Sequence, residues 1–118
     1  MPVGLTPTVS LGPRDLHSQL ELYLGGPKNR FTLFIKSKKE IEDTVAETAY
    51  QNTIEAYTKE GLPFEQYEME EISEKNIAEF FVFMMLTVVY LAEHLKVNAF
   101  DQPSVEDFKL KVHKDKSL

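Results

Sequence analysis

The chain has 118 residues, a formal net charge of −6 and no cysteine. Its length suits one small domain with a modest core, and its hydrophobic share of 42% is that of a globular protein rather than a disordered one. The acidic balance argues against a sequence-independent nucleic-acid binder, which needs a basic face to displace counterions. Without cysteine there is neither a disulfide framework nor a thiolate metal site, which fits a reducing cytoplasm.

The N-terminal region predicts an irregular segment followed by a short helix. Residues 1–12 are rich in proline, glycine and threonine, and they lack the charged and apolar regions of a secretory signal. A helix is expected over residues 16–24, with Asp15 as its N-terminal cap. The combination Gly25-Gly26-Pro27 is then expected to stop it.

A strand and a second helix are predicted next. Residues 31–35 form an apolar run of β-favouring side chains, which predicts a strand that is buried on both faces. The lysine-rich stretch 36–39 is followed by acidic residues and is expected to be a solvated loop. Residues 44–60 carry apolar side chains between polar ones and predict an amphipathic helix that ends at Gly61-Leu62-Pro63.

The second half of the chain predicts an edge strand and a long apolar helix. Residues 64–72 alternate imperfectly between apolar and charged side chains, as an edge strand does. Ser73 is expected to cap a helix that runs to about Lys96. Within this helix, residues 80–92 form an apolar run of 13 residues. Since a membrane span needs about 20 such residues, the helix is expected to be buried in a domain core or at a subunit contact, and no membrane partner is predicted.

A last helix is predicted from Pro103 to about Val112, because proline suits the first helical position, where its missing N–H costs nothing. The order of elements is therefore helix, strand, helix, strand, helix, helix. Strands that alternate with helices imply an α/β fold with a mostly parallel sheet. Since a stable sheet normally needs three or more strands, residues 1–118 are expected to form a single partial domain of a larger structure.

The junction before the last helix holds the most informative motif of the chain. Residues 97–106 read VNAFDQPSVE, and Lys109 follows three residues later. The amide of Gln102 stands just before the turn-setting Pro103. The amine of Lys109 can reach back toward the same junction, because helical side chains lean toward the N-terminus of their helix. By composition alone, this is an amphipathic terminal helix with an ordinary surface lysine.

A second motif lies near the other end of the chain. Residues 12–19 read GPRDLHSQ and put His17 in the first turn of its predicted helix, next to Asp15. Histidine can exchange a proton in either direction near neutral pH. The helix dipole disfavours protonation of His17 and the nearby carboxylate favours it, so the sequence leaves its charge open. The alternative is a half-buried histidine with a structural hydrogen bond.

Together, the two motifs resemble segments of glucose-6-phosphate isomerases. Residues 97–106 are similar to the family's C-terminal signature VNPFDQPGVE, which is also followed by a lysine, although Ala99 and Ser104 stand where the family has proline and glycine. Residues 12–19 are similar to the family's D-(Q/L)-H-S segment. The resemblance spans essentially the whole chain but only the last part of the enzyme. It implies an α/β fold: the C-terminal part of a sugar isomerase (SIS-type) parallel-sheet domain, with long C-terminal helices.

The resemblance also implies roles for three side chains. In the family, the matched histidine and lysine open the hexose ring, so His17 is expected to accept the proton of the anomeric hydroxyl and Lys109 to act at the ring oxygen. Gln102 matches the glutamine that contacts the phosphate end of the substrate. The implied reaction interconverts glucose 6-phosphate and fructose 6-phosphate in glycolysis and gluconeogenesis, and it needs neither a cofactor nor a metal.

Two parts of the family's machinery have no counterpart in the sequence. The aldose–ketose step depends on a glutamate in a Gly-Glu-Ser-type segment before the histidine motif, and a loop rich in serine and threonine holds the phosphate. Neither segment is present. Glu47, Glu55 and Glu106 lie outside any matching motif. The chain alone is therefore expected to be inactive.

The implied partners are a hexose 6-phosphate substrate and the missing N-terminal part of the enzyme. Family members are typically dimers in which the histidine reaches the neighbouring subunit's site, so a homodimer with His17 acting in trans is expected for the intact enzyme. A cytoplasmic location is expected. Two alternatives stay open: an SIS-like module that binds a phosphosugar or a partner without turnover, and a structural remnant with no ligand.

Overall fold

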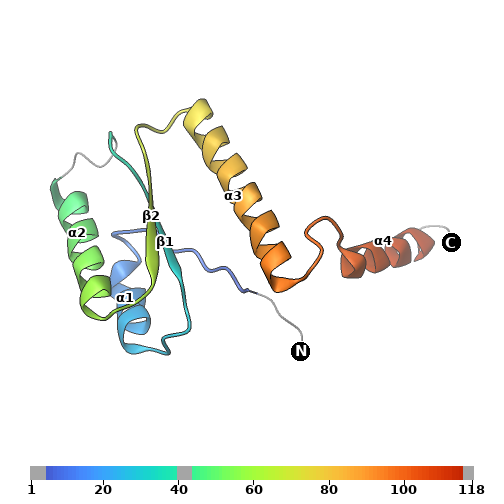
Figure 1. The fold of residues 1–118 in the computed structure, drawn as a ribbon, viewed down its shortest axis with the longest axis horizontal. Coiled ribbons are helices and arrows are strands. Elements are labelled where there is room, and N and C mark those ends of the chain that lie inside the picture. The colour runs from blue at the N-terminus through green and yellow to red at the C-terminus, as the bar shows by residue number, and fades with distance from the viewer. Residues whose placement is uncertain (1–4, 40–43, 116–118) are drawn as a thin grey trace. The chain divides into compact units, whose positions relative to one another are not determined.

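The computed structural model describes residues 5–39 and 44–115, and it has the predicted order of helices and strands (Figure 1). The elements in chain order are α1 (Leu16–Gly25), β1 (Thr32–Ser37), α2 (Thr44–Lys59), β2 (Phe64–Met69), α3 (Glu74–Leu95) and α4 (Pro103–Asp115). The prediction of an α/β fold is therefore confirmed.

The chain forms two compact units. The first runs to Glu79 and holds α1, β1, α2, β2 and the first residues of α3. The second begins at Phe80 and holds the rest of α3 together with α4. Each unit is described by itself below.

The two strands of the first unit pair in parallel, as their alternation with helices predicts. Thr32 lies opposite Phe64 at the start of the pair, and Ser37 lies opposite Met69 at its end. The backbone of Lys38 continues the ladder, since its N–H donates to the carbonyl of Met69 at 2.9 Å. The predicted edge strand is thus confirmed as β2, and β1 extends two residues beyond the apolar run that predicted it.

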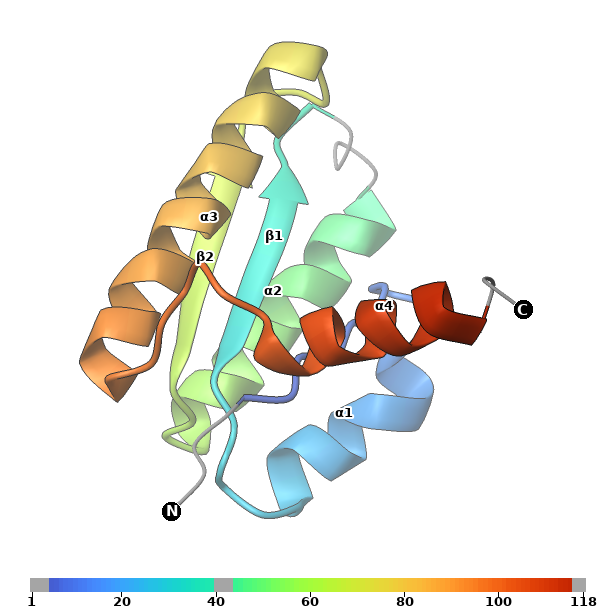
Figure 2. The same cartoon turned by 90° about the vertical axis from the view of Figure 1, so that its right-hand side faces the viewer.

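The helix α2 lies against one face of this sheet (Figures 1 and 2), and an aromatic cluster joins the helix to that face. The Tyr57 ring of α2 packs edge-on against Phe34 of β1, with 5.0 Å between ring centroids, and against Phe64 of β2 at 6.0 Å. Tyr57 is only 2% exposed, and its hydroxyl accepts a hydrogen bond from the Thr32 side chain at 3.2 Å. Tyr57 therefore ties α2 to both strands, and it is the centre of the small core.

The other face of β1 is less buried than its apolar sequence predicts. Ile35 points away from the aromatic cluster, because neighbouring side chains of a strand alternate between faces. Its exposed fraction is 49%, and that of Phe31 just before the strand is 66%. The prediction of a strand buried on both faces is wrong for the described residues, because the helix α2 can cover only one side of the sheet.

Local signals set the helix ends as expected. Gly61 adopts a φ of 63°, a left-handed conformation that favours glycine. The N–H of Leu62 donates to the carbonyl of Tyr57 and that of Gly61 to Thr58, which is the Schellman arrangement of a helix end. At the start of α3, the Ser73 hydroxyl accepts from the N–H of Asn76 at 3.3 Å, so the predicted cap is confirmed.

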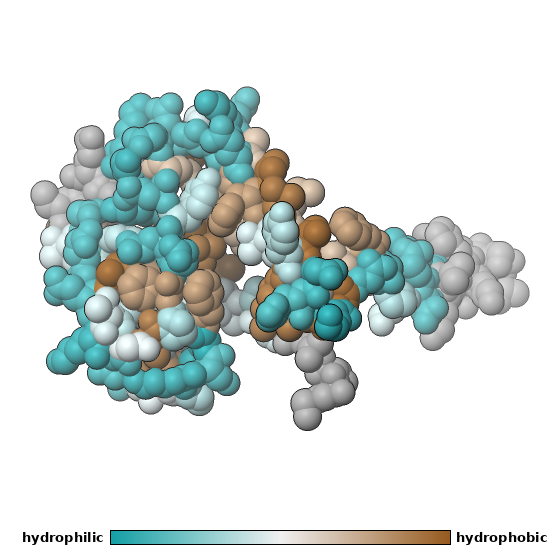
Figure 3. All heavy atoms as spheres, in the orientation of Figure 1, coloured by the Kyte–Doolittle hydropathy of each residue, from teal (hydrophilic) through white to brown (hydrophobic). Residues whose placement is uncertain are grey.

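The long helix α3 is apolar, as predicted, but little of it is buried by the described part of this chain. Ala92 is its one buried residue, and Tyr90 is 74% exposed. Hydrophobic residues gather on the surface over the stretch where Figure 1 draws α3 (Figure 3). By length and hydropathy α3 could also cross a membrane, although its apolar run is shorter than a span needs. Burial of α3 in a core formed by the described residues is not found.

Replacement of Tyr57 tests the assignment of the core. Tyr57→Ala leaves a cavity between α2 and both strands, so the free energy of unfolding should fall by about 3–5 kcal/mol. Tyr57→Phe keeps the ring and loses one hydrogen bond, for a loss of about 1 kcal/mol. Urea unfolding followed by circular dichroism measures both values. Asn52→Ala, at an exposed position of α2, is the control, and an equal effect of Asn52→Ala and Tyr57→Ala would refute the assignment.

Candidate functional site

His17 lies in the first turn of α1, and its side chain is exposed. The preceding loop is closed by Asp15. The Asp15 carboxylate accepts a hydrogen bond from the N–H of Leu11 at 2.8 Å, while the N–H of Asp15 donates to the carbonyl of Leu11 at 2.8 Å. The reciprocal pair fixes residues 11–15 as a compact turn that leads directly into the helix carrying the imidazole.

Asp15 occupies the predicted cap position but acts differently from the prediction. Its side chain makes no capping hydrogen bond to α1. Instead, the carboxylate turns back to Leu11 and pairs with Arg14, whose Nε lies 2.8 Å from Oδ1. The bond from Arg14 and then the Leu11 N–H lower the pKa of Asp15, so the carboxylate stays ionised at neutral pH. The N–H of Leu16 donates to the carbonyl of Pro13, and those of Ser18 and Gln19 donate to the carbonyl of Asp15, so backbone carbonyls rather than a side chain satisfy these groups at the start of α1.

Removal of the Asp15 carboxylate tests this loop closure. Asp15→Ala should raise the amide exchange rate of Leu11 by about fivefold, because one hydrogen bond to its N–H is lost. Arg14→Ala is the control: Arg14 is 72% exposed and its ion pair is screened by solvent, so little change is expected. Amide exchange measured by NMR gives both rates. Equal protection of Leu11 in the parent and in Asp15→Ala would show that the carboxylate does not hold the turn.

Gln102 is the N-terminal cap residue of α4 through its backbone. Its carbonyl accepts from the N–H groups of Val105 at 2.9 Å and Glu106 at 3.0 Å. Pro103 takes the first helical position, as predicted. Because the backbone carbonyl makes these bonds, the exposed amide side chain of Gln102 remains available at the start of the helix.

The turn before Gln102 is closed by a side chain. The carboxamide oxygen of Asn98 accepts from the N–H of Phe100 at 3.0 Å, a local bond typical of asparagine in turns. Before it, Lys96 ends α3 with a φ of 57°, a left-handed conformation that is uncommon for a residue with a side chain. Asn98 thus stabilises the turn that contains Ala99. The family signature that this segment resembles has proline at that position.

Lys109 lies two turns along α4 and is exposed. Its ammonium is 3.3 Å from the Glu106 carboxylate, one turn nearer to Gln102. The side chain therefore leans toward the start of the helix, as helical side chains do. An exposed pair of this kind is weak and exchanges readily with other partners, so Lys109 can leave Glu106 for an anionic or oxygen-bearing ligand at the start of α4.

The structure brings two of the three predicted site residues onto one element. Gln102 and Lys109 belong to the start and the second turn of α4, in the second unit, whereas His17 belongs to α1 in the first unit. Convergence of the imidazole and the ammonium on one sugar ring stays a prediction. Among the residues with a described placement, no three His, Asp or Glu side chains come together as metal ligands do.

A second polar cluster, which the sequence did not indicate, surrounds Lys36. The prediction of a solvated loop is wrong here, because Lys36 belongs to β1 and its side chain is only 12% exposed. Its Nζ lies 3.0 Å from Glu68 on β2, 3.4 Å from Glu47 on α2, and 4.6 Å from the ring centroid of Tyr50. Phe34 and Lys36 are two residues apart and therefore lie on the same, α2-facing side of β1. This spacing was the missed signal that Lys36 belongs to the strand.

Charge in the Lys36 cluster is balanced by hydrogen bonding. The hydrogen bond that Lys36 donates to Glu68 raises the pKa of Lys36, against the opposing effect of burial, and it lowers the pKa of Glu68. Glu47 also accepts from Gln51 at 2.7 Å, while its buried Oε2 has no hydrogen-bond partner within the described part of the chain. Every strong donor in the cluster is thus already engaged, which indicates a structural tie rather than a reactive lysine.

The stability contributed by Lys36 should depend on pH. The pKa of Glu68 is lowered from 4.5 in the folded protein. The ion pair of Glu68 with Lys36 therefore stabilises the fold fully above pH 4.5. This stabilisation is lost as the pH falls through the lowered pKa of Glu68. Lys36→Met should unfold at a lower temperature than the parent at pH 7, and this difference in unfolding temperature should shrink as the pH falls through the lowered pKa of Glu68, where its carboxylate protonates. Thermal unfolding followed by circular dichroism at a series of pH values measures this difference.

Lys38→Met provides the matched control for this pH series. Lys38 lies just after β1 and contacts Glu70 and, at 3.5 Å, also Glu68, but half of its side chain is exposed, so a smaller effect than that of Lys36→Met is expected. A pH-independent loss in Lys36→Met would contradict the ionic role of the cluster.

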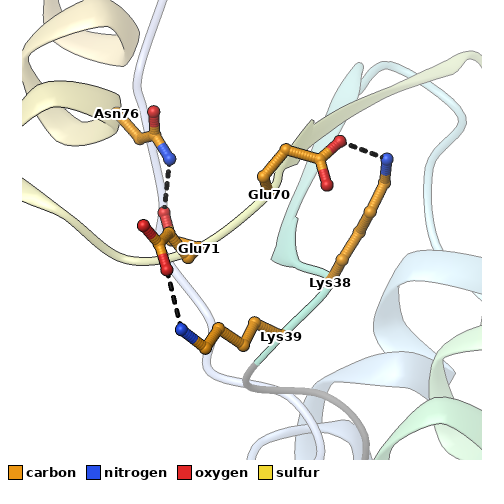
Figure 4. Close-up of a pocket in the computed structure, with 5 residues that line it drawn as sticks. All are labelled: Lys38, Lys39, Glu70, Glu71 and Asn76. Carbon is orange, nitrogen blue, oxygen red and sulfur yellow. Dashed lines mark hydrogen bonds and ion pairs between the residues drawn. The ribbon is translucent and has the colours of Figure 1, made fainter.

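One pocket, of about 410 Å³, lies at the carboxyl ends of the two strands, where open α/β sheets commonly bind ligands (Figure 4). Its cations are already paired: Lys38 contacts Glu70, and Lys39 contacts Glu71 at 2.8 Å. Asn76 donates to the backbone carbonyl of Glu71 at 2.8 Å. The pocket therefore offers opposite charges in equal number, which suits a junction between strand ends and α3 better than a phosphate site.

Comparison with known proteins agrees with the two motifs. The chain is 34% identical to the glucose-6-phosphate isomerase of Mycoplasmopsis pulmonis over 94% of its own length and 31% of the relative's. It is 29% identical to that of Methanocaldococcus jannaschii over 90% of its length and 31% of the relative's, and 26% identical to that of Carboxydothermus hydrogenoformans over 91% and 28%. No family model and no solved structure matches the chain.

The chain spans about three tenths of the length of these curated relatives. Several of them match it over nine tenths or more of its residues, so the match is not confined to the His17 and Gln102–Lys109 segments. The resemblance that those segments indicated is confirmed: the chain is related in sequence to glucose-6-phosphate isomerases and matches only a portion of each.

Proposed function

We propose that the chain is the C-terminal portion of a glucose-6-phosphate isomerase and supplies the groups that open the hexose ring. The observation that carries this proposal is the sequence match to a set of such isomerases over nearly the whole chain and under a third of each relative. The intact enzyme would interconvert glucose 6-phosphate and fructose 6-phosphate in the cytoplasm, in glycolysis and gluconeogenesis, without a cofactor.

In this proposal, His17 exchanges the proton of the anomeric hydroxyl. Ring opening breaks the bond between C1 and the ring oxygen; a base takes the proton from the C1 hydroxyl, and an acid delivers one to the ring oxygen. An imidazole titrates near neutral pH and can do the first task. The exposure of His17 and the closed turn of residues 11–15 support this role, since they present the imidazole on a fixed first helical turn.

Lys109 and Gln102 would act from the start of α4. An ammonium can donate a proton to the ring oxygen or balance the negative charge that develops there. Gln102, at the cap position seven residues earlier, would hydrogen-bond the phosphate end of the substrate, which the adjacent helix N-terminus also favours. The lean of Lys109 toward the helix start supports a shared ligand for the two side chains.

The chain alone lacks the base for the aldose–ketose step. That step moves a proton between C2 and C1 through an enediol, and no segment here matches the glutamate segment that performs it in the family. Glu47, whose Oε2 is buried without a hydrogen-bond partner among the described residues, is held by Lys36 and Gln51. The missing N-terminal portion would supply the base and the phosphate loop, and a homodimer would bring His17 to the neighbouring subunit's site.

A chimaera tests the proposal. This chain would replace the matching segment of the Mycoplasmopsis pulmonis relative, and fructose 6-phosphate formation would be followed in a coupled assay. The isolated 118-residue chain should show no turnover, whereas the chimaera should be active. His17→Ala and Lys109→Ala in the chimaera should each lower kcat/KM by about 100-fold or more, as loss of an acid–base group does.

Matched controls are available on α3. His94→Ala and Lys75→Ala remove exposed side chains of the same types outside the site and should leave turnover unchanged. Turnover by the isolated chain, or full activity of the His17→Ala chimaera, would overturn the proposal. Tight binding of sugar phosphates by the isolated chain, measured by calorimetry, would favour a non-catalytic binding module instead.

A further inference from the structure

The first turns of α4 place Gln102, Glu106 and Lys109 on one face of the helix. Each residue turns an α-helix by about 100°, so the positions four and seven residues after Gln102 return to within about 40° of its direction. By the same geometry, Lys109 lies about 10 Å beyond Gln102 along the helix axis. All three side chains are exposed. Glu106 therefore lies between the two candidate site residues of α4.

Glu106 also contacts both of these residues. Its backbone N–H donates to the carbonyl of Gln102 at 3.0 Å, and its carboxylate accepts from the Lys109 ammonium at 3.3 Å. Among the residues whose side chains the structure describes, no other carboxylate pairs with Lys109. Glu106 thus joins a backbone bond to Gln102 with an ionic bond to Lys109.

The ion pair limits the directions in which the Lys109 side chain can extend. A lysine side chain is long and flexible, and it loses entropy when it is held in one direction. The Glu106 carboxylate favours those rotamers that bring the ammonium toward the start of the helix. An acid that is already oriented toward its target reacts faster than one that must first find it.

We propose that Glu106 is a positioning residue for Lys109: its carboxylate holds the ammonium on the Gln102 side of α4 until the sugar ring is bound. The inference rests on the proposed function, in which Lys109 acts at the ring oxygen. Glu106 itself forms and breaks no bond during the reaction. Because an exposed ion pair is weak, the ammonium can pass from the carboxylate to the ring oxygen.

The negative charge of Glu106 separates positioning from substrate binding. In the proposed function, Gln102 holds the phosphate end of the substrate, and a carboxylate one turn along the same face repels a phosphate. Loss of the Glu106 carboxylate should therefore slow the step that Lys109 performs without weakening the binding of the substrate. Damage to the fold of α4 would instead weaken binding as well.

Steady-state kinetics of the chimaera test the positioning role. Glu106→Gln should lower kcat by about tenfold, because a misplaced acid loses much of its effect, while KM stays the same or falls. Glu106→Asp keeps the charge on a shorter side chain and should return kcat to within about threefold of the parent. Asp107→Asn is the control: it removes the same charge from the next, exposed position of α4, which faces another side of the helix, and should change neither constant.

A double replacement shows whether Glu106 acts through Lys109. If it does, the addition of Glu106→Gln to Lys109→Ala should cause no further loss of kcat/KM, whereas independent effects would multiply. Multiplied losses would overturn the positioning role. Full activity of Glu106→Gln beside an impaired Lys109→Ala would do the same and leave the proposed function standing.

A measurement without turnover separates the two proposals. In the isolated 118-residue chain, NMR relaxation of the Lys109 Nζ, taken relative to the backbone amide of Lys109, reports the mobility of the ammonium apart from fraying of α4. Glu106→Gln should raise this mobility above that of the parent and of Asp107→Asn. Equal mobility in all three would overturn the positioning role, whatever the chimaera does. Raised mobility in Glu106→Gln, together with a chimaera that has no activity, would support the positioning role and contradict the isomerase proposal.

Discussion

One face of α2 holds the two parallel strands together, and it does so through contacts of two kinds. Near the start of the strands, the Tyr57 ring packs against an aromatic side chain from each strand. Near their end, Glu47 and Tyr50 surround the Lys36 ammonium, which also pairs with Glu68 on the neighbouring strand. Since α2 runs back along the sheet, its apolar end meets the strand starts and its polar end meets the strand ends. The same helix therefore fixes both the register and the direction of the pair.

A sheet of two parallel strands leaves one of its faces without cover. Parallel sheets are normally covered on both faces, and three or more strands are needed for independent stability. Here Ile35 is half exposed on the uncovered side of β1, and the apolar helix α3 has few buried residues. Both features leave apolar surface exposed that a layered α/β structure covers. The relatives that match the chain are about three times its length.

Local signals made most of the fold predictable, and long-range contacts account for the errors. Gly61, Ser73 and Pro103 each set a helix boundary through their own backbone or side chain, so the sequence predicts them correctly. The ends of β1 are set by pairing with β2, which carried Lys36 into the strand and out of the predicted loop. The Asp15 carboxylate accepts from the N–H of Leu11 rather than from an N–H of α1, because the preceding chain turns back toward it.

The candidate site also depends on both local and long-range contacts. A hydrogen bond between near neighbours prepares each half: Asp15 closes the turn before His17, and Asn98 closes the turn before Gln102. Such bonds need only a few residues of the chain, so each half can form its turn locally. Convergence of His17 and Lys109 on one substrate is a prediction that needs long-range packing instead, within or between subunits, and such packing is supplied by buried apolar surface. Local contacts therefore prepare the candidate residues, and only long-range packing can bring them together.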